Sequence, residues 1–283
     1  MIEIVKDFFV ETPALLWLCV LAIGIALECL IKNAHPLQSL SGYWLNFRHM
    51  VLYLLMIFLF LKPIMLFKEN IYELFGSKCI FNISSFDTSN WLGMFLAAFI
   101  VLFVTDFLFY LWHRALHSIS WLWDMHAVHH SDEEMNVLTG VRSHWTVFMF
   151  EAFTILLPAM IILGPSSKEV YSLVGISASW NFVAHSNIRF SFGSFSWVLV
   201  SPQLHRIHHS IYPEHRDKNF ASLFPVWDII FGTYYHPHSN EYPPTGIVGL
   251  KHNSLWQLSF YPIFQWIERI NCMRRRVICD LKT

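Results

Sequence analysis

Hydrophobic residues gather in five long runs along this chain. The runs cover approximately residues 13–31, 50–67, 91–112, 146–163 and 170–184. Each is close to the roughly 20 residues that a helix needs to cross a bilayer. The runs are continuous, whereas membrane strands would require alternating polarity and a closed barrel. The pattern therefore predicts an all-α, multi-pass helical membrane protein.

Proline and glycine interrupt these runs at three points. Pro63 follows Lys62 near the end of the second run and predicts a break in that helix. Pro158 and the pair Gly164 and Pro165 predict that the fourth and fifth runs form a hairpin.

Charge predicts the orientation of the spans. Five spans would place the loop 33–48, the polar segment after residue 112 and the tail after His185 on one side. Ten of the nineteen Lys and Arg residues lie from Arg189 onward, including the run 274–276. Because basic loops favour the cytoplasm, we expect this face to be cytoplasmic. Acidic residues and no basic leader precede the first run, so we expect it to be a retained span.

Three regions follow from this pattern. We expect residues 1–90 to form a membrane-spanning region. Residues 91–238 should form helical hairpins with a cytoplasmic cap. Eight histidines cluster in this region, so we expect it to be the catalytic region, with two metal ions held in the histidine-rich cap. Residues 239–283 should carry a basic tail and an interfacial helix at 255–272, where aromatic and polar side chains mix.

Composition narrows the class of protein. Hydrophobic residues make up 55% of the chain and charged residues 14%, as in integral membrane proteins. The net charge of −1 argues against a nucleic-acid partner. The five cysteines are scattered and contain no CxxC pair, so neither a disulfide framework nor a thiolate metal site is expected.

Eight histidines fall into three tight clusters beside the apolar runs. The clusters are His113 and His117, then His126, His129 and His130, and finally His205, His208 and His209. On a helix, spacings of three and four residues place side chains on one face. Eight imidazoles exceed the ligands that one metal needs, since a tetrahedral zinc takes about four. The clusters predict a two-metal site at a membrane surface.

The ligand type leaves several metals open, because imidazole suits iron, zinc, copper and nickel. A hydrolytic zinc site of the HExxH type would carry a glutamate within the cluster, and none of the three clusters does. Two redox metals in an apolar setting fit the activation of oxygen for attack on an unactivated C–H bond.

The sequences HRALH, HAVHHS and HRIHHS, with the following DKNFASLFPVWDIIFGTYY, resemble the fatty acid hydroxylase/sterol desaturase superfamily. The similarity is greatest to its bacterial branch and to the alkylglycerol monooxygenases, and it covers roughly residues 106–235. It implies a di-iron enzyme that uses molecular oxygen on a lipid, with zinc as a possible substitute in purified protein. It also implies electrons from a b-type cytochrome, ferredoxin or reductase. The membrane would be the bacterial inner membrane, or the endoplasmic reticulum of a eukaryote.

Several further residues are candidates near the metals. The resemblance places His185 where relatives often supply another ligand, with Asn181 one turn before it and His144 near a position where relatives read HP. Asn181 could also hydrogen-bond a neighbouring helix. Ligating histidines usually donate their second N–H to a carboxylate or carbonyl. Asp106, two helical turns before His113, is the first candidate for that role. Asp124 and Asp228 are others, although each could cap a helix.

The remaining polar groups carry no spacing signal. We expect a solvated turn at residues 132–134 and loop positions for His236 and His238. Surface positions are expected for His35, His49, His215 and His252.

Other functions remain open. A membrane metal-binding or metal-transport protein would place ionisable residues along several spans and its metal sites at mid-membrane, whereas here the histidines gather at span ends on one face. A scaffold that keeps the fold without catalysis would lack a ligand, whereas all three clusters are intact. The chain has no GxGxxG, P-loop or CxxCH motif, so its electrons must come from a separate protein. The spacing does not distinguish hydroxylation from desaturation.

Overall fold

The computed structural model describes residues 14–31, 40–75, 79–164, 179–250 and 254–280. This part of the chain is helical, with no strand beyond the isolated bridge between Ser210 and Thr245. Its longer helices are α2 (Ala14–Leu30), α3 (Leu40–Phe75), α4 (Trp91–Ser118), α5 (Ser120–His130) and α11 (Leu255–Asp280). Its shorter helices are α6 (Trp145–Glu151), α7 (Leu157–Leu163), α9 (Pro202–His208) and α10 (Val226–Ile230). The predicted helical membrane fold with a histidine-rich cap is confirmed.

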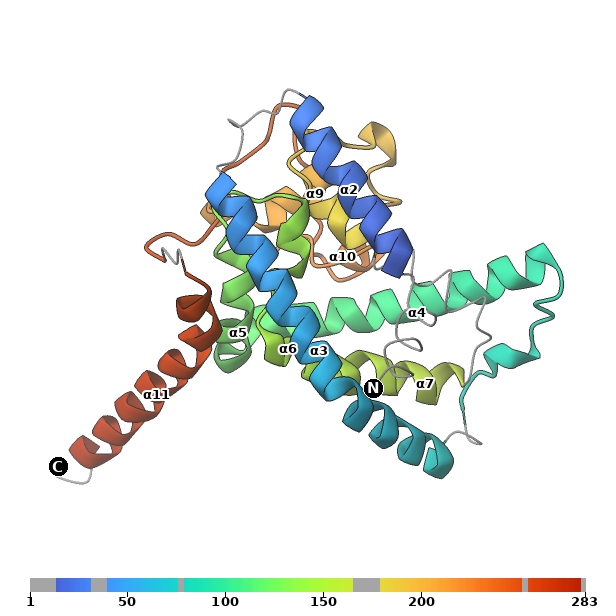
Figure 1. Cartoon of the computed structure of the whole chain (residues 1–283), viewed down its shortest axis with the longest axis horizontal. Helices are drawn as coiled ribbons and strands as arrows, with labels where there is room; N and C mark the ends of the chain where they lie inside the picture. The colour runs from blue at the N-terminus through green and yellow to red at the C-terminus, as the bar shows by residue number, and fades with distance from the viewer. Residues whose placement is uncertain (1–13, 32–39, 76–78, 165–178, 251–253, 281–283) are drawn as a thin grey trace.

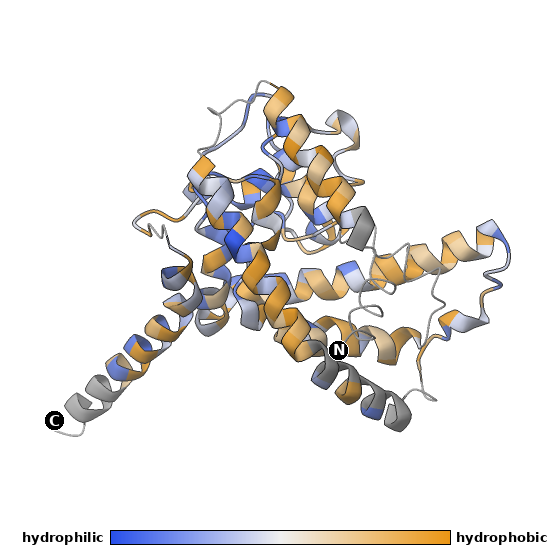
Figure 2. Cartoon of the chain, in the orientation of Figure 1, coloured by the Kyte–Doolittle hydropathy of each residue, from blue (hydrophilic) through white to orange (hydrophobic). Residues whose placement is uncertain are grey.

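Among the described residues, three helices are long and apolar enough to cross a membrane. They are Leu40–Phe60 within α3, Trp91–Ser118, and Trp145–Leu163, which runs through α6 and α7. The first predicted span is a shorter apolar helix, Trp17–Leu30, and packs against η3 (Val137–Val141) and Phe182. The fifth predicted span lies largely outside the described residues, and so does any hairpin that it would form. Figure 2 shows the hydrophobic colour concentrated on α4, α7 and α3.

The predicted break at Pro63 is wrong, because α3 continues through it to Phe75. A proline within a helix removes one backbone donor, and the apolar helix continues despite that loss. Pro158 is accommodated differently. A π-helical turn, η4 (Ala152–Leu156), precedes it, and Pro158 lies directly after that turn in the continuous helix from Trp145 to Leu163, where the irregular hydrogen bonding of the π turn accommodates the missing N–H. Gly164 ends α7 with a φ of 67°, a conformation that glycine adopts without strain.

The start of α4 is fixed by a side-chain cap. Asn90 accepts a hydrogen bond of 2.8 Å from the backbone N–H of Gly93. Farther along, Ala97, Ala98 and Val101 pack with Leu163 of α7. In Figure 1, α4 and α7 run together away from the cap, while α11 projects from the other side. The C-terminal end of α4, which carries His113 and His117, therefore lies at the cap.

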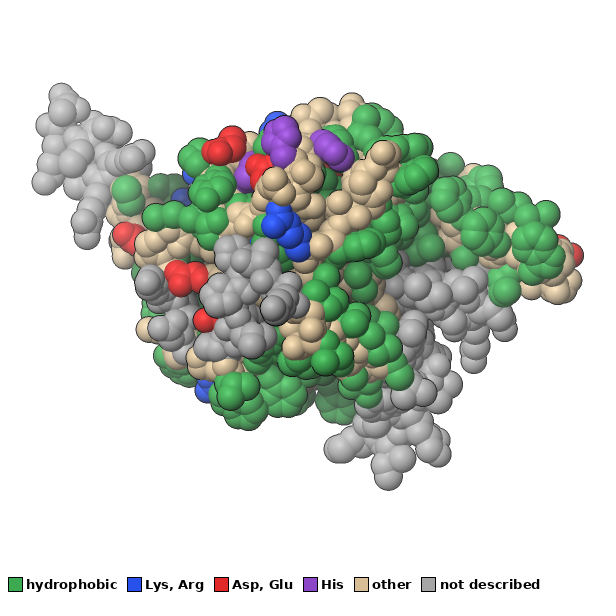
Figure 3. Space-filling view, turned by 90° about the horizontal axis from the view of Figure 1, so that it is seen from above, with side chains coloured by type: hydrophobic (Ala, Val, Ile, Leu, Met, Phe, Trp, Pro, Cys, Tyr) green, Lys and Arg blue, Asp and Glu red, His purple; other side chains and the backbone are tan. Residues whose placement is uncertain are grey.

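The cap is built from α5, η3, α9, α10 and their connections (Figure 1). Charged and histidine side chains gather on part of its outer face, with hydrophobic side chains over much of the surrounding surface (Figure 3). The base of α11 packs on it through Leu258, which contacts Val128 and Leu45. Farther along α11, Phe264 and Ile267 are exposed. The interfacial placement of α11, the cytoplasmic side of the cap and the boundaries 1–90, 91–238 and 239–283 stay predictions.

Candidate metal centre

Nine imidazoles converge in the cap from four parts of the chain. The end of α4 supplies His113 and His117, and α5 supplies the second cluster. A helical segment at 179–185 ends in His185, and α9 with the residue after it supplies the third cluster. These are the nine histidines that the sequence indicates as ligands. Helix α5 follows α4 directly and packs against it, so the first two clusters face each other.

The nine imidazoles divide into two groups. The five-imidazole group contains His113, His117, His126, His130 and His208. The four-imidazole group contains His129, His185, His205 and His209. Within each group the candidate ligand atoms all lie within 4.8 Å of one another. His129 and His130 are neighbours on α5 but belong to different groups, because successive side chains on a helix point in different directions.

The Nε2 atoms approach one another as ligands of a common ion would. In the five-imidazole group, the Nε2 atom of His126 lies 3.0 Å from that of His113 and 3.1 Å from that of His130. In the four-imidazole group, the Nε2 atom of His185 lies 3.1 Å from that of His129 and 2.9 Å from that of His205. Two nitrogens that bind one ion at about 2.0–2.1 Å, roughly at right angles, lie about 3 Å apart.

The other ring nitrogens show which tautomer is present. Nδ1 of His113 donates to the carbonyl of Phe220 at 2.6 Å, and Nδ1 of His185 donates to the carbonyl of Asn181 at 2.7 Å. A carbonyl can only accept, so the proton is on Nδ1 and the Nε2 lone pair faces the group. Nε2 of His208 is buried without a hydrogen-bond partner among the described residues. Clustered lone pairs of this kind fit a metal cation.

Burial keeps these imidazoles neutral. It lowers the pKa of His126, His129 and His130 well below the usual value, and neighbouring imidazoles lower it further. The same causes act on His205, His208 and His209. Neutral imidazole is the form that binds metal, so the six are available as ligands near neutral pH.

Asp106 and Asp228 support a loop rather than an imidazole. The carboxylate of Asp106 accepts backbone hydrogen bonds of 2.9 Å from both Leu223 and Phe224. Asp228 accepts from the backbone of Phe220 and Ala221 at 2.8 and 2.9 Å. The prediction that Asp106 itself orients an imidazole is wrong, because the Phe220 carbonyl already takes the second N–H of His113.

The other candidates near the metals also take structural roles. His144 caps α6, bonding the Thr146 hydroxyl at 2.6 Å and the Ser259 carbonyl at 2.9 Å, and belongs to neither group. The side-chain amide of Asn181 donates to the Gly140 carbonyl at 2.7 Å. Asn181 reaches the site only through its backbone carbonyl, which accepts from His185.

Asp124 pairs with a basic side chain of α11. Both of its oxygens accept hydrogen bonds of 2.8 Å from the Arg269 guanidinium. Asp124 therefore anchors α11 and does not orient an imidazole.

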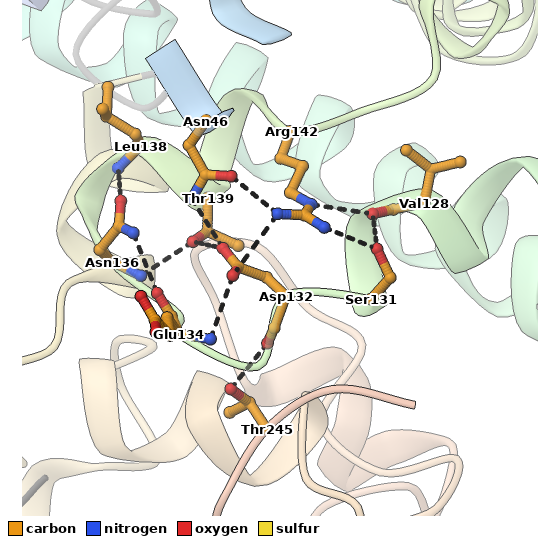
Figure 4. Close-up of polar contacts among 10 residues, drawn as sticks. All are labelled: Asn46, Val128, Ser131, Asp132, Glu134, Asn136, Leu138, Thr139, Arg142 and Thr245. Atoms are coloured by element: carbon orange, nitrogen blue, oxygen red, sulfur yellow. Dashed lines mark hydrogen bonds and ion pairs between the residues drawn. The ribbon is translucent and has the colours of Figure 1, made fainter. Parts of the chain in front are cut away.

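A buried ion pair lies directly after the second cluster (Figure 4). The expectation of a solvated turn is wrong for Asp132, which is 3% exposed. Its carboxylate accepts from Asn46 at 2.8 Å and Thr139 at 2.6 Å, and it lies 3.6 Å from Arg142. Nothing in the spacing of these residues distinguishes this pair from an ordinary turn.

Arg142 also fixes the end of α5. Its guanidinium donates to the Ser131 hydroxyl at 2.9 Å and, less closely, to the Val128 carbonyl at 3.4 Å. A cation bound to the last carbonyls of a helix stabilises that end. The pair thereby holds the turn at Ser131 (Figure 4), which directly follows His129 and His130 in the sequence.

Two histidines expected at the surface are buried. His215 bonds the Ser210 hydroxyl and the Glu241 carboxylate, each at 2.8 Å. His49 is 2% exposed, and neither of its ring nitrogens has a hydrogen-bond partner among the described residues. His236 and His238 are exposed, as expected. His35 and His252 lie outside the described residues.

Comparisons with known proteins agree with this geometry. Residues 98–233 match the family model described as Fatty acid hydroxylase. The chain is 30% identical to the alkylglycerol monooxygenase of Caenorhabditis elegans, over 58% of this chain and 34% of that protein. It is 28% identical to the ornithine lipid hydroxylase OlsE of Rhizobium tropici, over 52% of this chain and 44% of that protein.

More distant similarity extends to sterol enzymes. The chain is 29% identical to human cholesterol 25-hydroxylase, over 47% of this chain and 48% of that protein. The matched region spans about a third of the alkylglycerol monooxygenases with which it aligns. No solved structure matches the chain.

Proposed function

Because this chain belongs to the fatty acid hydroxylase family through residues 98–233, we propose that it is an oxygen-dependent, di-iron lipid hydroxylase or desaturase. Relatives named for alkylglycerol, ornithine lipid and cholesterol support a lipid substrate. The observation that carries the proposal is the division of nine imidazoles, eight of them buried and that of His117 partly buried, into two groups, each compact enough for one ion.

The donor set is compatible with iron. All nine candidate ligands are imidazoles, which suit iron, and no carboxylate belongs to either group. Iron ions held there would supply the oxidising chemistry that attack on an unactivated C–H bond requires. The protein's part is to keep the imidazoles neutral, to hold their Nε2 atoms about 3 Å apart and to exclude water by burying them.

The setting favours a resident metal centre over metal transport. The imidazoles lie at the end of α4 and in the cap, rather than along a path through the spanning helices. The apolar helices beside the cap fit delivery of a lipid from the bilayer. The sequence has no dinucleotide-binding fingerprint, so we propose a separate electron donor on the cytoplasmic face.

The test combines metal analysis with turnover. The protein is purified anaerobically in detergent from iron-replete cells and assayed for iron and for oxygen-dependent conversion of membrane lipids by mass spectrometry. We expect two iron ions per chain, and no turnover in His208→Ala. The control is His236→Ala, an exposed loop residue that should retain activity. A single zinc without iron, or full activity in His208→Ala, would contradict the proposal.

A further inference from the structure

One short segment, residues 217–220, contacts three of the five imidazoles in the five-imidazole group. The Phe220 carbonyl accepts from His113 Nδ1 at 2.6 Å, and the Lys218 carbonyl accepts from His208 Nδ1 at 2.8 Å. The Asp217 carboxylate lies 3.4 Å from His117 Nδ1. In the four-imidazole group, by contrast, His185 donates to its own helix, at Asn181.

The backbone of this segment adopts an uncommon conformation. Asp217 and Asn219 have φ values of 58° and 57°, and they are the only non-glycine residues with positive φ in the described ranges. Asp and Asn tolerate this left-handed region better than other residues with a Cβ atom. Alternation between left-handed and ordinary conformations turns the carbonyls of Lys218 and Phe220 toward the imidazoles. Uncommon backbone of this kind often lies at functional sites.

The segment is held on both sides. Asn219 donates to the Tyr235 carbonyl at 3.0 Å and accepts from the Tyr235 N–H at 2.8 Å. It also approaches the Leu204 carbonyl of α9 at 3.3 Å, beside the third histidine cluster. On the other side, Asp228 binds the N–H groups of Phe220 and Ala221. The carbonyls that face the imidazoles are therefore fixed in place.

We propose that residues 217–220 are the outer support of one metal centre only, and that Asp217 and Asn219 are positioning residues for the five-imidazole group. Partners of the second ring nitrogen fix the orientation of an imidazole and raise its basicity as a ligand. This inference rests on the metal-binding part of the proposed function and goes beyond it, since it makes the two centres unequal in their outer support.

The test measures metal binding without turnover. Chelator-treated full-length protein in detergent is titrated with Co²⁺, followed by visible absorption and calorimetry. His129→Ala removes one ligand from the four-imidazole group. His126→Ala removes from the five-imidazole group the ligand whose Nε2 lies within 3.1 Å of both His113 and His130, so each change weakens one group selectively. In the His129→Ala background, Asn219→Ala should weaken Co²⁺ binding about 10- to 100-fold. In the His126→Ala background, the same change should have no effect.

Asp217→Asn, which changes an exposed side chain, should give a smaller loss with the same selectivity. Glu214→Gln is the control, since Glu214 is exposed on the neighbouring turn η6 (Pro213–His215) and should leave binding unchanged. Circular dichroism reports folding. If Asn219→Ala does not fold, Asn219→Gly takes its place, because glycine keeps the left-handed conformation and removes only the side-chain bonds.

Equal weakening in both backgrounds, or no weakening in either, would overturn the proposal. A wild-type protein that binds two Co²⁺ ions but converts no lipid would instead contradict only the proposed activity. The two ideas therefore fail through different measurements.

Discussion

Arg269 of α11 forms a two-pronged ion pair with Asp124 of α5, with both N–O distances at 2.8 Å. Asp124 is buried, whereas the Arg269 side chain is 36% exposed. The Trp266 indole adds a bond of 3.0 Å to the Trp121 carbonyl. Helix α11 is thus fastened to the helix that carries the second histidine cluster. This contact joins residues 145 positions apart, a separation at which sequence spacing gives no indication of pairing.

The first prediction concerns this pair. Arg269→Met should lower the free energy of unfolding by about 1–2 kcal/mol, because it leaves the Asp124 carboxylate buried without its cation. Adding Asp124→Asn should recover part of that loss, since the neutral amide is less costly to leave unpaired. Thermal unfolding in detergent measures both. A double variant as unstable as the sum of the two single variants would show that the residues do not interact.

The second prediction concerns the buried pair in Figure 4. Arg142→Met should destabilise the protein by about 3–5 kcal/mol, because Asp132 remains buried without its cation. It should also lower iron occupancy, since the end of α5 loses its cap. Glu133→Gln, at an exposed neighbour, should change neither property. Unchanged stability and iron content in Arg142→Met would mean that the pair supports neither the fold nor the site.

The sequence predicts the ligand-type residues better than their supports. Helical spacing of three and four residues was sufficient to indicate eight imidazoles, because that spacing alone sets which side chains share a face. The supports of His113 and His208 are the carbonyls of Phe220 and Lys218, and a carbonyl is present in every residue. Asp106, predicted to orient His113, instead binds the backbone at Leu223 and Phe224. Its partners are backbone groups more than 100 residues away, which no local pattern reveals.

The same limit explains the errors in the fold. Pro63 is a sound local signal for a break, yet α3 continues through it to Phe75. Asp132 lies in a stretch of acids typical of a solvated turn. It is buried only because Asn46 and Thr139 reach it from other elements.

The third prediction concerns acidity. Burial lowers the pKa of His126, His205 and His208, among others, well below the value of about 6.5 in an unfolded chain. Below pH 6.5 the unfolded chain therefore binds more protons than the folded chain. The free energy of unfolding of the metal-free protein should fall as the pH falls below 6.5, by up to about 1.4 kcal/mol per pH unit for each such imidazole.

Thermal unfolding of chelator-treated protein between pH 7.5 and 5.0 measures this dependence. His208→Gln should make the slope shallower, because one buried imidazole no longer titrates. A melting temperature that stays constant over this range would contradict the expectation that the metal-free imidazoles are buried and neutral.

The last prediction concerns Gly140, which lies against Asn181, the residue whose backbone carbonyl orients His185 of the four-imidazole group. A Cβ atom added there would lie 2.9 Å from the side-chain nitrogen of Asn181 and 3.1 Å from its carbonyl oxygen. That carbonyl orients His185, whose Nε2 atom faces both His129 and His205. The backbone oxygen cannot move without shifting the imidazole, and sites of this kind tolerate displacements of only about 0.5 Å.

Gly140→Ala should therefore weaken Co²⁺ binding about 10-fold in the His126→Ala background, where only the four-imidazole group is intact. It should have no effect in the His129→Ala background, which is the reverse of the result expected for Asn219→Ala. Ser143→Ala, which adds no atom nearby, is the control. Weakening by Gly140→Ala in both backgrounds would mean that the change distorts the whole cap, and unchanged binding in both would mean that the Asn181 carbonyl does not set the position of His185.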